Sequence, residues 1–149
     1  MPVLEFADGT CICDALSICR YFEELYPEPA LMGRTPVEKA LIEMWNRRAE
    51  LDGYLVVHDI ARHSHPIFLD RSVSGGASGF PQMPAVAEHS RRRFQLFIHR
   101  FEERLGQSRF VAGDSFTVAD ITTFVTLEFA KWIGLEVPES HCNLRRFGE

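Results

Sequence analysis

The sequence lacks long hydrophobic runs, an excess of positive charge and closely spaced cysteines. Its 149 residues contain no stretch of about 18 apolar residues, so we expect no membrane-spanning helix and no membrane partner. Acidic residues outnumber basic ones by 21 to 16, which argues against nucleic acid as a partner. The four cysteines form no CxxC pair and the first residues carry no secretory signal, so we expect reduced thiols and a cytoplasmic location.

The beginning of the chain has the pattern of a β-hairpin followed by a helix. Residues 2–6 and 10–13 have the composition of two short strands, and residues 7–9 between them are turn formers. Asp14 is a suitable N-cap for a helix that runs to about residue 26, where prolines stop it. We therefore expect the order strand, strand, helix.

Helical periodicity dominates the rest of the chain. Thr35 and Glu38 have the spacing of a capping box, and the apolar spacing after them predicts one long amphipathic helix that continues to about residue 62. A loop rich in Gly, Ser and Pro over residues 70–84 separates it from a second long helix over residues 85–105. The two helices should pack antiparallel to each other.

A second capping box, formed by Thr117 and Asp120, predicts the start of a third helix. Apolar residues cover more of its circumference than a single stripe would, so we expect this helix to be the most buried one. These residues are Ile121, Phe124, Val125, Leu127 and Phe129. A short helix over residues 138–147 is expected after it.

Two segments together resemble the glutathione S-transferase family, namely PVLEFADGTCICDALSICRYFEELYP near the start and FVAGDSFTVADITTFV near the end. The resemblance covers nearly the whole chain. It implies a mainly α fold, a glutathione transferase C-terminal-type helical bundle preceded by a partial thioredoxin-like β-hairpin and helix. It divides the chain into a remnant of the thioredoxin-like glutathione-binding domain (residues 1–27), a linker (28–34) and an all-helical C-terminal domain (35–149).

The resemblance also implies glutathione as a substrate and places the residues that bind it. Asp14 matches the acidic residue that holds the glutamyl end of glutathione at a helix start, and Ala15 stands where the family has Ser or Thr. Pro2 matches a proline held in a cis peptide, and Met1 precedes it, where the family pairs its backbone with the cysteinyl part of glutathione. A helix start suits an anionic group because its unpaired N–H groups face the ligand.

The implied reaction in complete relatives is a detoxification step, the conjugation of glutathione to a small hydrophobic electrophile by a homodimer. The Tyr, Ser or Cys that activates the thiol lies ahead of the proline in that family, and no segment here matches it. We therefore expect an incomplete chain with no catalytic residue of its own. Two alternatives stay open: a noncatalytic module that dimerises or docks on partners, and a relative with isomerase, dehalogenase or thiol-reductase chemistry.

Three residues at helical spacing, Trp45, Tyr54 and His58, could line the hydrophobic-substrate pocket that the resemblance implies, although such a stripe is more often part of a core. His58 could also hold a metal together with His63 and His65. Polar residues at a helix end explain these histidines better, so we expect no metal site.

Overall fold

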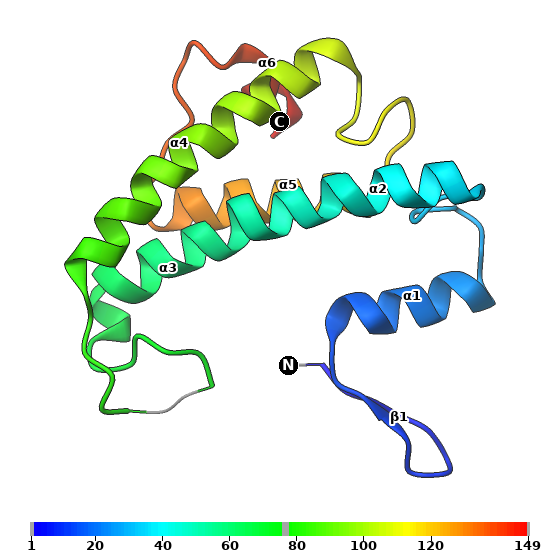
Figure 1. The fold of residues 1–149 in the computed structure, drawn as a ribbon, viewed down its shortest axis with the longest axis horizontal. Helices are drawn as coiled ribbons and strands as arrows, with labels where there is room; N and C mark the ends of the chain where they lie inside the picture. The colour runs from blue at the N-terminus through cyan, green and yellow to red at the C-terminus, as the bar shows by residue number, and fades with distance from the viewer. Residues whose placement is uncertain (1, 76–77, 149) are drawn as a thin grey trace.

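The computed structural model describes residues 2–75 and 78–148, and within them it has a small two-stranded sheet and mostly helices (Figure 1). This confirms the predicted fold class. In chain order the elements are β1 (Leu4–Glu5), β2 (Cys11–Ile12), α1 (Ala15–Leu25), α2 (Pro36–Arg48), the π-helix η1 (Ala49–Tyr54), α3 (Leu55–Ser64), the 3-10 helix η2 (Pro66–Phe68), α4 (Pro84–Gln107), α5 (Val118–Trp132) and α6 (Cys142–Phe147).

The predicted hairpin is present and is shorter than the sequence suggested. The two strands pair antiparallel, Leu4 opposite Ile12, so only two residues of each strand belong to the ladder. Gly9 adopts a φ of +86° in the turn, a left-handed conformation that costs glycine little. Asp14 then caps α1 as predicted, because its carboxylate accepts a hydrogen bond from the Ser17 backbone N–H.

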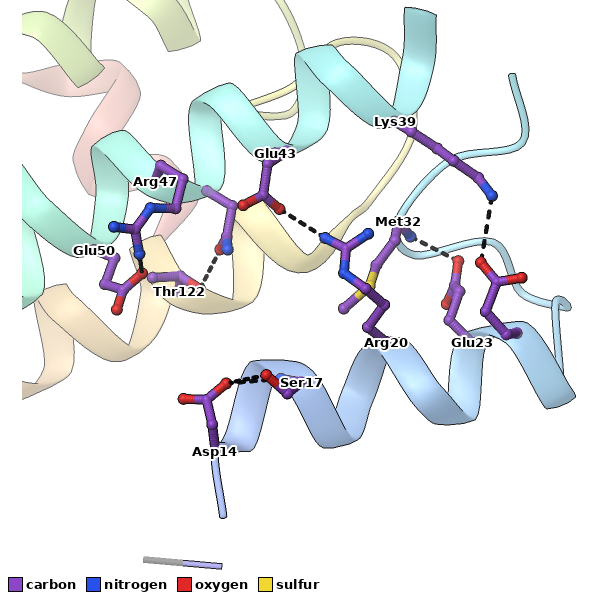
Figure 2. A network of polar contacts seen from close by, with 12 residues as sticks. Asp14, Ser17, Arg20, Glu23, Met32, Lys39, Glu43, Arg47, Glu50 and Thr122 are labelled. Atoms are coloured by element: carbon purple, nitrogen blue, oxygen red, sulfur yellow. Dashed lines mark hydrogen bonds and ion pairs between the residues drawn. The ribbon is translucent and has the colours of Figure 1, made fainter. Parts of the chain in front are cut away.

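Polar contacts connect α1 to the linker and to α2 (Figure 2). Arg20 on α1 lies 3.0 Å from Glu43 on α2, and the Met32 N–H donates to the Glu23 carboxylate at 2.7 Å. No residue of α1 is buried, in contrast to the helices of the bundle. The hairpin and α1 therefore lie beside the bundle and add little to its core.

The predicted long helix between residues 35 and 62 is not one regular α-helix. Its capping box at Thr35 is confirmed, but a π-helical turn, η1, separates α2 from α3. Gly53 in this turn lies so close to the Phe97 ring that a Cβ would stand 2.6 Å from Cε2 of Phe97. Arg93 on α4 donates a hydrogen bond to the carbonyl of Leu51, which belongs to the same turn, at 3.3 Å. The contact with α4 thus accompanies a register change that local sequence periodicity does not report.

The core lies where α3, α4 and α5 meet. Helix α4 runs opposite to α3 and packs against it, which confirms the predicted antiparallel arrangement (Figure 1). The largest fully buried side chains come mainly from these two helices: Phe94, Phe97, Phe101, Ile60, Ile98, Val56 and Val57. Burial of these aromatic and branched side chains is the main source of the bundle's stability.

The prediction that the third helix is the most buried one is wrong, because six of its 15 residues are buried, compared with five of the 10 residues of α3. Ile121, Phe124 and Val125 on α5 are 39%, 45% and 45% exposed. The buried face consists instead mainly of small residues: Ala119, Thr123, Thr126 and Ala130. Small side chains let α5 approach α2 and η1 closely, while Ile121, Phe124 and Val125 lie on a more exposed face of the helix.

The capping box of α5 is confirmed and also ties down the preceding loop. The fully buried Asp120 carboxylate accepts hydrogen bonds from the Thr117 N–H at 2.8 Å and the Thr117 hydroxyl at 3.0 Å. Its second oxygen accepts from the Val111 N–H at 2.8 Å. One carboxylate therefore joins the helix start to the chain that leaves α4.

The final predicted helix is present over a shorter range, as α6. Glu102 on α4 holds its start by accepting hydrogen bonds from the N–H groups of Asn143 and Leu144 and from the Asn143 side chain. None of the helices in the described ranges has both the length and the hydropathy needed to cross a membrane.

Candidate functional site

The first part of the site is the carboxylate of Asp14 at the start of α1 (Figure 2). Its Oδ2 accepts hydrogen bonds from the Ser17 backbone N–H and from the Ser17 hydroxyl, both at 2.8 Å. These two bonds lower the pKa of Asp14 below its usual value of 3.8. The carboxylate is exposed and fully charged near neutral pH, so it can pair with a cationic ligand group while the helix start accommodates an anionic one.

Ser17 is a residue that the sequence reasoning missed. Ala15, at the position where the resemblance implies a hydroxyl, is exposed and has none to offer. The Ser17 hydroxyl lies within hydrogen-bond distance of the Asp14 carboxylate and therefore stands at the same helix start. The signal was available, because the third residue after an N-cap is the one whose N–H the cap accepts.

The proposed roles of Met1 and Pro2 stay predictions. Met1 lies outside the described residues, and the peptide bond that precedes Pro2 depends on it. Pro2 itself is exposed, just before β1.

A second part of the site is a row of aromatic side chains, Tyr54, Phe129, Trp132 and His65, which we call the aromatic row. Ring centroids lie 5.7 Å apart between Tyr54 and Phe129, 5.9 Å between Phe129 and Trp132, and 4.9 Å between Trp132 and His65. The Trp132 side chain is 55% exposed. The row therefore offers an apolar, partly exposed surface of the kind that stacks against a planar ligand.

His58 lies one helical turn after Tyr54 and has polar partners. Its Nε2 is 3.2 Å from Arg62 Nε and 3.1 Å from the Ser74 hydroxyl. Because a guanidinium only donates, Nε2 is the unprotonated acceptor of both bonds. Burial lowers the pKa of His58 below its usual 6.5 and the Arg62 charge lowers it further, against the opposing effect of Asp59. His58 is thus a neutral imidazole near pH 7.

Of the three predicted pocket residues, Tyr54 and His58 lie on neighbouring helical turns, and Trp45 is separated from them. Trp45 packs edge-on against Phe101 with a centroid distance of 5.7 Å. Arg48 and Arg104 lie over its ring at 4.8 Å and 5.0 Å. Trp45 therefore contacts the core and two cations, whereas Tyr54 contacts the aromatic row. Whether any of the three binds substrate stays a prediction.

The three histidines near the end of α3 point to different partners. The His63 Nδ1 accepts from the Met83 N–H at 3.1 Å, His65 stacks on Trp132, and His58 binds Arg62. In the part of the chain that the structure describes, no group of three or more His, Cys, Asp or Glu could hold a metal ion. These histidines organise the end of the helix.

A cavity of about 830 Å³ lies apart from both parts of the site, between the end of α4, the start of α5 and α6. Its walls include Phe110, Phe116, Phe124 and Phe147, with Arg109 and Arg146. Ile121 and Phe124, two of the exposed apolar residues of α5, line it. Neither Asp14 nor the aromatic row lines it.

Comparisons with known proteins point to one family. The family model for the glutathione S-transferase C-terminal domain matches residues 84–145. The sequence is similar to Glutathione S-transferase 2 of Saccharomyces cerevisiae, with 37% identity over 139 residues, 93% of this chain and 57% of the relative. The chain spans little more than half the length of the curated relatives that it matches over most of its own length.

Solved structures give the same picture over the whole chain. The fold is similar to that of Gtt2 from Saccharomyces cerevisiae, with a TM-score of 0.87 and 36% identity over 99% of this chain and 68% of that one. It is also similar to a glutathione S-transferase domain-containing protein from Marinobacter aquaeolei, with a TM-score of 0.88 and 32% identity over 99% of this chain and 69% of that one.

Proposed function

Because this chain belongs to the glutathione S-transferase family, we propose that it contributes glutathione-binding and electrophile-binding residues to an enzyme that conjugates glutathione to small hydrophobic electrophiles. The observation that carries the proposal is the exposed, charged Asp14 carboxylate at the start of α1. It provides a ligand contact that the packing of the bundle does not require.

Asp14 would bind the glutamyl end of glutathione through charge. That end carries an ammonium group and a carboxylate. The Asp14 carboxylate suits the ammonium, and the N–H groups at the start of α1 suit the carboxylate. The Ser17 hydroxyl, which donates to Asp14, lies at the same helix start and would take the place of the hydroxyl that Ala15 lacks if its proton turned toward the ligand. Pro2 and the backbone of Met1 would then lie beside the cysteinyl part.

The aromatic row would receive the electrophile. A planar electrophile gains dispersion and loses contact with water when it stacks on a partly exposed surface such as Trp132. In the reaction itself, the glutathione thiolate forms a bond to the electrophilic carbon and the leaving group departs with the electron pair of the broken bond. Thiolate formation needs a group that stabilises it. In the family that group belongs to a segment that the matching residues here do not include.

Exposed apolar side chains along α2, η1 and the start of α3 support the predicted homodimer and also the alternative of a noncatalytic dimerisation module. Five of them are each at least 36% exposed: Val37, Leu41 and Met44 on α2, Leu51 on η1 and Leu55 at the start of α3. Helix pairs commonly bury such side chains between them.

Calorimetric titration with glutathione at millimolar concentrations tests the proposed function. The matched variant is Asp14→Asn, since asparagine is as good an N-cap as aspartate but carries no charge. We expect the wild-type chain to bind and Asp14→Asn to bind about 10-fold more weakly, the loss expected for one charge-assisted hydrogen bond. Asp114→Ala, an exposed aspartate in the loop before α5, is the control.

Two results would contradict the proposal. Equal affinity of the wild type and Asp14→Asn would remove Asp14 from the site. Absence of binding by the wild type, together with a stable dimer in light scattering, would favour the noncatalytic module.

A further inference from the structure

We propose that Arg62 is a positioning residue that holds the loop between η2 and α4 against the end of α3. Held there, the loop forms one wall of the site that binds the electrophile. The part of the loop concerned is residues 70–74 and 79–83. The inference rests on the proposed function and adds to it a specificity element outside the residues that the resemblance implied.

Arg62 contacts the first half of the loop through two hydrogen bonds to backbone carbonyls and also supports His58, a second contact. Its Nη1 donates to the carbonyls of Arg71 at 3.0 Å and Val73 at 3.3 Å. Its Nε donates to His58, which binds the Ser74 hydroxyl in turn. The guanidinium also lies 4.4 Å from the Phe68 ring centroid. Arginine suits this role because its planar group donates in several fixed directions.

The second half of the loop is attached to the same helix end. The Gln82 side-chain amide donates to the carbonyls of Arg62 and His65, both at 2.9 Å. Helix ends leave carbonyls such as that of Arg62 without helical partners, so Gln82 acts as a cap from outside the helix. The Met83 N–H donates to His63 at 3.1 Å.

The two halves of the loop are joined to each other. The Ser72 N–H donates to the Phe80 carbonyl at 3.0 Å, and the Ser72 hydroxyl donates to the Pro81 carbonyl at 3.1 Å. The Phe80 N–H donates to the Asp70 carbonyl at 3.2 Å. The described parts of the loop, residues 70–74 and 79–83, are therefore joined to each other and share their attachment to α3.

The attachment lies next to the aromatic row. His58 accepts a hydrogen bond from the Ser74 hydroxyl and lies one helical turn from Tyr54. His65 accepts a hydrogen bond from Gln82 at its carbonyl, and its ring stacks on Trp132. In Figure 1 the loop and the hairpin lie on the same side of the α2–α3 rod. An electrophile that stacks on the row therefore has this loop as its neighbour, at the end opposite to α1.

The test compares three ligands on the purified chain: glutathione, S-methylglutathione and S-(4-nitrobenzyl)glutathione. In Arg62→Ala we expect the affinity for the nitrobenzyl conjugate to fall at least fivefold, while the other two affinities change less than twofold. Ser74→Ala, which leaves Arg62 in place, should act in the same direction to a smaller extent. Arg92→Ala is the matched control, since Arg92 pairs only with Glu88 on the exposed side of α4 in the described structure.

Hydrogen exchange of the same variants reports on the attachment without any ligand. The amides of Ser72, Phe80 and Met83 should exchange at least 10-fold faster in Arg62→Ala, while those of α5 keep their wild-type rates. Unchanged exchange in the loop would overturn the inference, as would equal losses for all three ligands or a loss for none. Failure of the wild type to bind glutathione would instead overturn the proposed function, so the two failures are distinguishable.

Discussion

Substitution of Gly53 by alanine tests whether η1 needs a glycine where it packs against Phe97 on α4. A Cβ at this position would lie 2.6, 2.8 and 3.0 Å from Cε2, Cζ and Cδ2 of Phe97. The Phe97 ring cannot move aside easily, because it is buried and its centroid lies 4.4 Å from that of Phe101 and 6.0 Å from that of Phe94.

Two opposing contributions set the size of the effect. Replacing glycine by alanine inside an exposed helix stabilises a protein by about 1 kcal/mol. Forcing an extra carbon into a packed core costs about 1–3 kcal/mol. We expect the packing cost to dominate, so that Gly53→Ala lowers the free energy of unfolding by about 1–2 kcal/mol. For a chain of this size, each kcal/mol lowers Tm by about 2–4 °C.

Urea unfolding followed by circular dichroism measures this change, and a double-mutant cycle with Phe97→Leu identifies its cause. Leucine removes the ring atoms that the new Cβ would meet. In that background Gly53→Ala should be neutral or stabilising, which gives a coupling of about 1 kcal/mol or more. Stabilisation by Gly53→Ala in the wild-type background, or strict additivity with Phe97→Leu, would show that the contact with Phe97 does not require a glycine at position 53.

Two further predictions concern buried and partly buried carboxylates. Asp120→Ala should lower the free energy of unfolding, measured in urea, by about 3 kcal/mol, because it leaves the buried N–H groups of Thr117 and Val111 without an acceptor. The control Asp114→Ala, at an exposed position, should change it by less than about 0.5 kcal/mol. Equal effects of the two substitutions would contradict the role of Asp120. For Glu102, burial raises the pKa, but hydrogen bonds from α6 outweigh it and the net pKa lies below the usual 4.5. The packing of α6 against α4 should therefore be fully stabilised above pH 4.5 and should weaken as the pH falls through the lowered pKa of Glu102. Hydrogen exchange of the α6 amides measures this change. Glu102→Gln should remove the pH dependence.

Local patterns predicted the helix starts because a cap is a contact between residues three positions apart. Asp14 binds Ser17, Thr35 forms a box with Glu38, and Thr117 forms one with Asp120. The donor and acceptor meet as soon as the first turn forms, so no distant residue is needed. The hairpin was predictable for a similar reason, since its turn joins neighbouring strands.

The candidate site was only partly predictable, because its two parts depend on contacts over different distances. Asp14 came from a local motif and a family resemblance. The aromatic row combines Tyr54 from η1, His65 from the end of α3, and Phe129 with Trp132 from α5. Helical spacing grouped Trp45 with Tyr54 and His58, but packing against Phe101 separates Trp45 from them.

The amino-acid order alone determined which segments are helical, where the three capped helices start and to which family the chain is related, because these depend on contacts within a few residues and on motifs. The tertiary structure decided the π turn at Gly53, the exposure of Phe124 and Val125, and the attachment of the loop to Arg62. Each of these depends on how closely two helices approach or on which distant backbone groups need partners, and neither quantity is encoded in the periodicity of a single segment.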